Sequence, residues 1–111
     1  MKKLLLLVVF VLMLFRANGQ NLVRNPGMDS SLYCPQGQAD INACRYWFNP
    51  TQNTPDYFHL CDTFLAPLNL WGWQMPHSDS GYLGFAAFLY YQPNMREYVS
   101  ANLLTPLQAG K

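Results

Sequence analysis

The residues best suited to binding chemistry are two tryptophans separated by a single glycine, Trp71 and Trp73. Alternate residues of an extended chain share a face, so both indole rings are predicted to point to the same side. A flat apolar ring with a polar N–H is a platform on which a sugar ring stacks. Further ligand contacts are expected from polar side chains of neighbouring loops: Tyr57, His59, Asn69, His77 and Asp79. The alternative is that the tryptophans fill a core and the polar side chains close turns, and we expect core packing for at least one tryptophan.

Catalysis is not indicated by the sequence. Residues 78–81 (Ser-Asp-Ser-Gly) lack the G-x-S-x-G pattern of a nucleophile elbow, and there is no glycine-rich phosphate-binding loop. The chain has two histidines and six acidic residues. Almost any chain has enough such residues for a hypothetical catalytic triad, so their presence is no evidence for catalysis. The cysteines and histidines show no C-x-x-C or H-x-x-x-H spacing, which disfavours a zinc site. We therefore expect a protein that is not an enzyme.

The charge pattern indicates which classes of binding partner can be excluded. The 111-residue chain has seven basic and six acidic residues and a formal net charge of +1. Nucleic-acid binding and electrostatic attachment to a membrane surface both need a basic face, so neither is expected. Aromatic residues are abundant, and no lysine lies between Lys3 and Lys111. Such a neutral, aromatic-rich composition suits carbohydrates and other uncharged polymers.

The N-terminus predicts export. A pair of lysines precedes an apolar run at 4–15, and small residues at 17–19 (Ala-Asn-Gly) match a signal-peptidase site. Residues 1–19 are therefore predicted to be a helical Sec signal peptide. Its apolar run is shorter than the ~20 residues that a membrane-spanning helix needs, so no membrane span is expected after cleavage. The predicted location is secreted or on the cell surface.

Three cysteines follow this segment, Cys34, Cys44 and Cys61. In an exported protein one disulfide and one leftover thiol are expected. The residues alone allow three pairings.

Short strands between glycine and proline turns are predicted for the rest of the chain. Segment 47–61 is too broken by proline for a helix, and we interpret it as an ordered loop held by its cysteine, with Trp47 in the core. Residues 82–91 are the most strand-like run, and residues 96–104 alternate like a second strand. No amphipathic helical pattern of useful length is present. The prediction is an all-β fold, a β-sandwich.

The sandwich is expected to be incomplete. Residues 20–111 provide too few strands to fill a second layer, and the last of them form an Ala-Gly-Lys turn. We therefore expect residues 20–111 to be the N-terminal part of a module that continues beyond the chain end.

Several blocks of the sequence together resemble a known family. They are Asn21-Leu-Val-x-Asn-Pro, Cys34-Pro35, Trp47-Phe-x-Pro-Thr-x-x-Thr-Pro-Asp-Tyr-Phe-x-x-Cys61, Gly72-x-Gln74-x-Pro76-x-Ser78, Gly81-Tyr-x-Gly84, Arg96-Glu-Tyr98 and Leu104-x-Pro-Leu-x-Ala-Gly-Lys111. This order is similar to the N-terminal module of secreted surface proteins of gliding-type Gram-negative bacteria. The blocks cover nearly all of residues 20–111.

The resemblance implies a galactose-binding-like jelly roll placed ahead of other domains of the same polypeptide. Those domains include outer-membrane-protein-A-like peptidoglycan-binding domains and gliding-motility-associated C-terminal sorting domains. It also implies a Cys34–Cys61 disulfide, because these cysteines occupy the family's cysteine positions and Cys44 does not.

A structural calcium is a further implication of the resemblance, because Asp29 matches the acidic position near the first strand of such jelly rolls. Calcium takes six to eight oxygen ligands, whereas Asp29 is the one acid nearby. A turn-forming aspartate is therefore the favoured alternative, and no other cofactor is expected.

These observations together predict a non-catalytic, exported cell-surface module that binds or displays, with a carbohydrate or cell-wall polymer as its partner. The alternative is a purely structural interaction or spacer domain whose aromatic residues are all in the core. A fragment of a secreted hydrolase is a more distant alternative.

Overall fold

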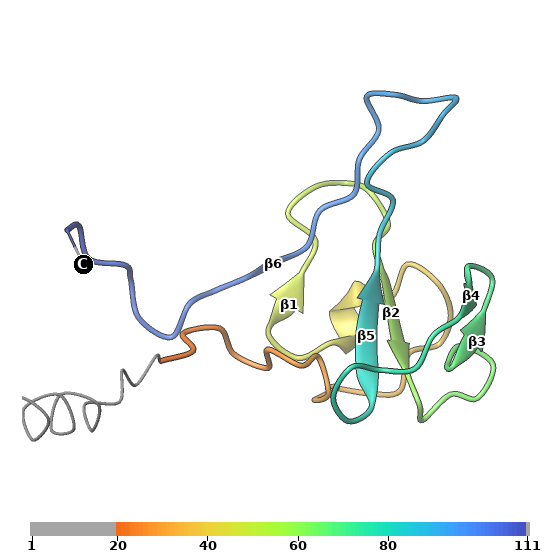
Figure 1. Ribbon diagram of the computed structural model, residues 1–111, viewed down its shortest axis with the longest axis horizontal. Helices are drawn as coiled ribbons and strands as arrows, with labels where there is room; N and C mark the ends of the chain where they lie inside the picture. The colour runs from red at the N-terminus through yellow and green to blue at the C-terminus, as the bar shows by residue number, and fades with distance from the viewer. Residues whose placement is uncertain (1–19, 111) are drawn as a thin grey trace, which may run out of the picture.

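The computed structural model describes residues 20–110, which form three antiparallel pairs of short strands around one 3₁₀ turn (Figure 1). In chain order the elements are η1 (Ile41–Ala43), β1 (Trp47–Phe48), β2 (Asp56–His59), β3 (Leu68–Asn69), β4 (Gly72–Trp73), β5 (Gly81–Gly84) and β6 (Ser100–Ala101). The strands pair as β1–β6, β2–β5 and β3–β4. The fold is thus β-rich with almost no helix, as the all-β prediction required. The predicted signal peptide lies outside the described residues.

The β2–β5 ladder is the centre of the fold. Its register places Tyr57 opposite Leu83 and Phe58 opposite Tyr82. Because alternate strand residues point to opposite faces, one face carries Tyr57 and Leu83, and the other carries Asp56, Phe58 and Tyr82. The first face packs on the core, and the second forms the floor of a groove.

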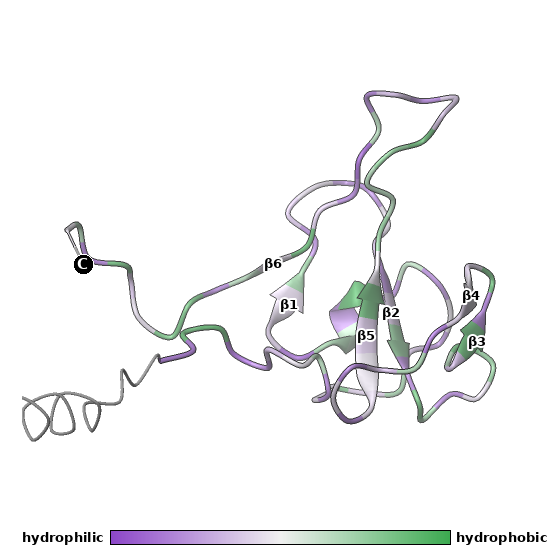
Figure 2. Cartoon of the chain, viewed as in Figure 1, coloured by the Kyte–Doolittle hydropathy of each residue, from purple (hydrophilic) through white to green (hydrophobic). Residues whose placement is uncertain are grey.

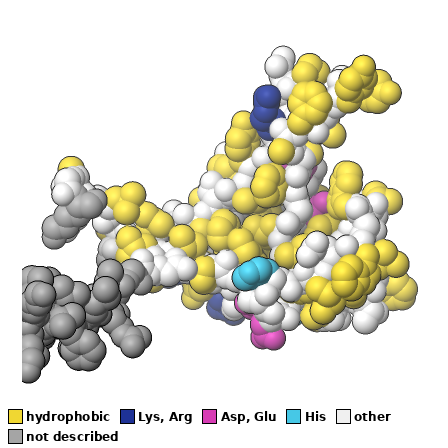
Figure 3. All heavy atoms as spheres, viewed as in Figure 1, with side chains coloured by type: hydrophobic (Ala, Val, Ile, Leu, Met, Phe, Trp, Pro, Cys, Tyr) yellow, Lys and Arg dark blue, Asp and Glu magenta, His cyan; other side chains and the backbone are white. Residues whose placement is uncertain are grey.

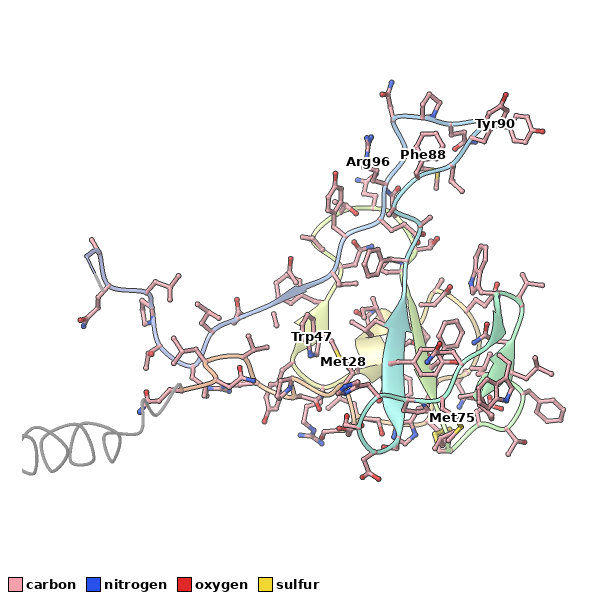
Figure 4. All side chains as sticks on the ribbon, in the orientation of Figure 1. Met28, Trp47, Met75, Phe88, Tyr90 and Arg96 are labelled. Carbon is pink, nitrogen blue, oxygen red and sulfur yellow. A yellow bond between two sulfur atoms is a disulfide. The ribbon has the colours of Figure 1, made fainter. Side chains whose placement is uncertain are left out.

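The core lies between the ladder and η1. Its buried members are Ile41, Ala43, Cys44 and Tyr57, and Met28, Trp47, Leu83 and Val99 pack against them. Figure 4 shows Met28 and Trp47 beside η1 and β1, and Figure 2 shows that η1, β2 and β5 each contain hydrophobic residues. Trp47 is half-buried rather than enclosed, and its indole N–H donates to the Asn25 carbonyl at 2.9 Å.

Segment 47–61 differs from the loop that the sequence predicted. It contains β1 and β2, and β2 is buried over its first three residues. The two prolines, Pro50 and Pro55, lie between these strands rather than inside them, so neither removes a ladder hydrogen bond. The aromatic pair after Pro55 is therefore free to form the central strand.

The strand predicted over 82–91 is shorter than expected. β5 ends at Gly84, and residues 85–97 form a projecting loop, seen at the top of Figure 1. Backbone hydrogen bonds close its base and tip, from Glu97 N to Ala86 O at 2.9 Å and from Gln92 N to Leu89 O at 3.1 Å. Beyond Gly84 the described residues offer no strand to extend the β2 ladder, so the aromatic run continues with only an isolated bridge between Leu89 and Gln92.

The strand predicted over 96–104 is likewise reduced to β6, with Leu103 adding an isolated bridge to Val23. This bridge and the hydrogen bond from Leu104 N to Leu22 O, 2.8 Å long, hold the last described segment beside the first. In residues 20–110 no helical segment has the length and apolarity needed to cross a membrane.

The Cys34–Cys61 disulfide is present, as the resemblance implied, with a Cα–Cα distance of 5.9 Å. It ties the chain before η1 to the residues that follow β2. Cys44 is the remaining thiol and is buried in the core. Burial raises the pKa of the Cys44 thiol to about 12, so it is protonated and unreactive at neutral pH.

Candidate functional site

A groove of about 580 Å³ lies on the face of the β2–β5 ladder that points away from the core. Its floor is the ladder, one wall is the β3–β4 hairpin, and the other is the first arm of the projecting loop at 85–89. Figure 3 shows hydrophobic side chains on both sides of a notch at this place, with acidic atoms inside it. We call this feature the aromatic groove.

The floor of the aromatic groove follows from the alternation of β2 and β5. Phe58 and Tyr82 face each other across the ladder with ring centroids 5.1 Å apart. Gly84 is opposite Asp56, and a Cβ at Gly84 would lie only 2.7 Å from the Phe58 ring. The missing side chain therefore leaves room for the Phe58 ring over Gly84.

Trp71 and Trp73 both line the groove. Trp71 lies in the turn between β3 and β4, before Gly72 at φ 122°, so the extended alternation that the prediction assumed does not hold there. Their exposed fractions are 68 and 67%. The expectation that at least one of them packs in the core is therefore wrong. The reason is that β3 and β4 pair only with each other, and no described element covers the side of the hairpin that carries the rings.

Trp71 is held in place by a buried acid. Its indole N–H donates to Asp56 Oδ2 at 2.9 Å, while Asp56 Oδ1 accepts the Ala39 N–H. Asp56 is only 5% exposed, so these hydrogen bonds are needed to satisfy its carboxylate. The sequence gave no sign of the bond between Asp56 and Trp71.

Asn69 connects the hairpin to the floor. Its side-chain amide donates to the Tyr82 hydroxyl at 2.8 Å, and its oxygen accepts the Trp71 backbone N–H at 2.9 Å. Of the polar residues predicted to contact a ligand, Asn69 is the one that the structure brings into the groove.

Glu97 reaches the groove from the second arm of the projecting loop. One carboxylate oxygen accepts the Ala86 N–H at 2.7 Å, and the other accepts the Thr54 hydroxyl at 3.0 Å. Glu97 was not among the ligand contacts expected from the sequence, so this groove residue was missed.

Tyr57 does not reach the groove, and its prediction as a ligand contact is wrong. It is fully buried on the core face of β2, one residue out of phase with Asp56 and Phe58. Its hydroxyl donates to the Met28 carbonyl at 2.8 Å, and burial raises the pKa of that hydroxyl.

His77 and Asp79 are exposed, but they do not line the aromatic groove. They lie in the turn before β5, where the Asp79 backbone N–H donates to Asp29 at 3.0 Å. His59 also lies away from the groove, with Nε2 3.2 Å from the Asp29 carbonyl oxygen. The structure therefore separates these three residues from the tryptophans with which the sequence grouped them.

Asp29 closes this turn instead of forming a cation site. Its Oδ1 accepts backbone N–H groups of residues 79–81, and Oδ2 accepts the Ser78 hydroxyl at 2.7 Å. Calcium requires a shell of six to eight oxygens, whereas the partners here are donors. Among residues 20–110 no group of three or more His, Cys, Asp or Glu side chains is placed to hold a metal. These residues do not fit a calcium site.

The Asp29 turn predicts a pH dependence of stability. Desolvation of the carboxyl acts to raise its pKa, but the hydrogen bonds from residues 78–81 outweigh it and hold the pKa of Asp29 below the ordinary 3.8. A folded-state pKa below the unfolded one adds stability that is present above the unfolded pKa and lost as pH falls through the folded pKa. The urea midpoint should therefore decrease as the pH is lowered below about 4. This decrease should be smaller in Asp29→Asn than in the wild type. Parallel curves for the two proteins would contradict this role.

Comparison of the chain with protein-family models, curated proteins and solved structures finds no match. The interpretation of the aromatic groove therefore rests on its own residues. What these residues can do is stack on a ring through two exposed indoles, and offer amide and carboxylate groups at the edge of that ring.

Proposed function

We propose that this protein is an exported, non-catalytic module that binds a carbohydrate or cell-wall polymer in the aromatic groove. The observation that carries the proposal is the exposure of both Trp71 and Trp73 on one wall of the groove. Large apolar rings gathered at the surface are typical of binding sites, and indoles offer both a stacking face and a hydrogen-bond donor.

The size and polarity of the groove support this proposal. Its volume of about 580 Å³ lies within the ~300–1,000 Å³ that is usual for ligand sites. Asn69 and Gln74 supply amide groups beside the rings, and such groups suit the hydroxyls at the rim of a sugar. Stacking would supply the affinity and the amides the orientation.

We further propose that residues 20–111 belong to a galactose-binding-like β-sandwich of a cell-surface protein, with further domains on the same polypeptide. The family resemblance of the sequence blocks supports this assignment. The Cys34–Cys61 disulfide supports an oxidising, extracytoplasmic location, where such bonds persist.

The test is binding of the purified protein to an array of cell-wall polysaccharides. Trp73→Ala should lower the affinity for any bound glycan about tenfold, because truncating an aromatic anchor costs more than about 1 kcal/mol. Trp73 is preferred over Trp71 because truncation of Trp71 would also leave buried Asp56 without a donor. Tyr91→Ala is the matched control, since Tyr91 is 92% exposed and lies outside the groove. Equal losses in both variants would contradict the groove as the site.

The second candidate is a structural interaction domain, and one observation favours it. The tip of the projecting loop carries exposed aromatic residues outside the groove, among them Tyr90, which points outward in Figure 4. Exposed apolar patches also mark protein contacts. If no polysaccharide binds and Tyr91→Ala disrupts association with a protein partner, this second function is the correct one.

A further inference from the structure

We propose that the aromatic groove selects a cationic glycan, one whose amino sugars carry free, protonated amines. This inference rests on the carbohydrate-binding function proposed above and names its substrate class. It follows from the charges that the fold brings to the groove.

The lining of the groove holds two acidic residues, Asp56 and Glu97, and no lysine, arginine or histidine. Asp56 is almost completely buried beneath Trp71. A charge in such surroundings is screened by solvent and salt much less than a surface charge. Arg96, the basic residue next to Glu97 in the sequence, is absent from the lining of the groove. Figure 4 shows it on the outer side of the loop, away from Phe88.

The hydrogen bonds that hold the two carboxylates come from neutral groups. Asp56 accepts from the Ala39 N–H and the Trp71 indole, and Glu97 accepts from Thr54 and the Ala86 N–H. Neutral donors position a carboxylate without cancelling its charge. Each carboxylate oxygen can also accept more than one hydrogen bond. The negative potential of the groove is therefore available to a ligand.

The aromatic rings add to this preference. The face of an indole ring is the negative end of its quadrupole, so it attracts an ammonium group within about 6 Å of its centroid. Trp71 and Trp73 thus favour a cation as well as the apolar face of a sugar. Both forms of the glycan can use the stacking and the amide groups. A glycan with protonated amines also uses the attraction of the ring faces and of the carboxylates for a cation, which the N-acetylated form lacks.

The decisive experiment compares two ligands with the same sugar backbone, one with free amines and one with N-acetylated amines. Calorimetric titration of the purified protein with a glucosamine hexamer and with the N-acetylglucosamine hexamer should give about tenfold tighter binding of the amine form. Equal or tighter binding of the N-acetylated hexamer would overturn the inference and leave the carbohydrate function standing. Absence of binding by both, together with a silent polysaccharide array, would remove the proposed function itself.

Variants that remove a negative charge test which residues cause the preference for the amine form. Glu97→Gln and Asp56→Asn should each weaken binding of the glucosamine hexamer several-fold, relative to binding of the N-acetylated hexamer by the same variant. Asp79→Asn removes the same charge from an exposed residue outside the groove and should have no effect. If Asp56→Asn does not fold, Glu97→Gln decides the point. Equal weakening by Asp79→Asn would overturn the inference, as would a lysine peptide that binds as tightly as the glucosamine hexamer.

Discussion

Replacing Cys34 and Cys61 together by alanine is expected to lower the free energy of unfolding by about 3 kcal/mol. The disulfide joins residues 27 positions apart, and in the chain-entropy model a loop of this length restricts the unfolded chain by roughly that amount. The measurement is urea unfolding followed by tryptophan fluorescence.

The effect should be large relative to total stability, because the core that the fold builds is small. Few side chains are fully buried, and many large hydrophobic residues stay exposed. Domains with a small core often depend on disulfides for much of their stability. Here the bond fixes the residues before η1 against the end of β2, the strand that supplies both the core and the groove floor.

A reducing agent provides the control for this prediction. Dithiothreitol should lower the urea midpoint of the wild type to that of the double variant and leave the double variant unchanged. Cys44 has no part in this response, since its thiol is buried and protonated. A wild-type midpoint that does not respond to reduction would show that the disulfide adds nothing to stability.

The pairing of these cysteines shows what kind of information the sequence carried. Spacing alone allowed three pairings, and the resemblance to a family selected the one that forms. The all-β class was accessible from turn residues and aromatic runs, because these are local signals. Strand ends were not accessible, because a strand ends where its ladder partner ends. β5 stops at Gly84 since β2 begins at Asp56, opposite it.

The candidate site was predictable only in part, for a related reason. Trp71 and Trp73 were identified as candidates from residue type and spacing, but their exposure depends on whether another element covers them. The groove carboxylates depend on contacts between distant segments, such as Thr54 with Glu97, 43 residues apart. The prediction of Tyr57 as a ligand contact failed because neighbouring residues of a strand point to opposite faces. Tyr57 is one step from the groove face and therefore points to the core.

The contact between β5 and the N-terminal segment gives the second large effect. Gly81→Ala is expected to destabilise the protein by about 1–3 kcal/mol, the usual range for overpacking. A Cβ at Gly81 would overlap the Met28 carbonyl oxygen and lie 2.9 Å from the Tyr57 hydroxyl. That hydroxyl donates to the same carbonyl, so a shift that relieves the overlap would leave a buried hydroxyl without its partner.

Gly37→Ala is the matched control for this change. A Cβ at Gly37 meets nothing within 4 Å, so its cost in the folded state is small. Alanine also reduces the entropy of the unfolded chain, which favours folding by about 0.4–1 kcal/mol where the backbone permits it. This gain applies to both glycines, so the difference between the two urea midpoints isolates the overlap at Gly81. Equal midpoints would mean that β5 can move away from Met28 without loss, and that Tyr57 does not lock the N-terminal segment onto the ladder.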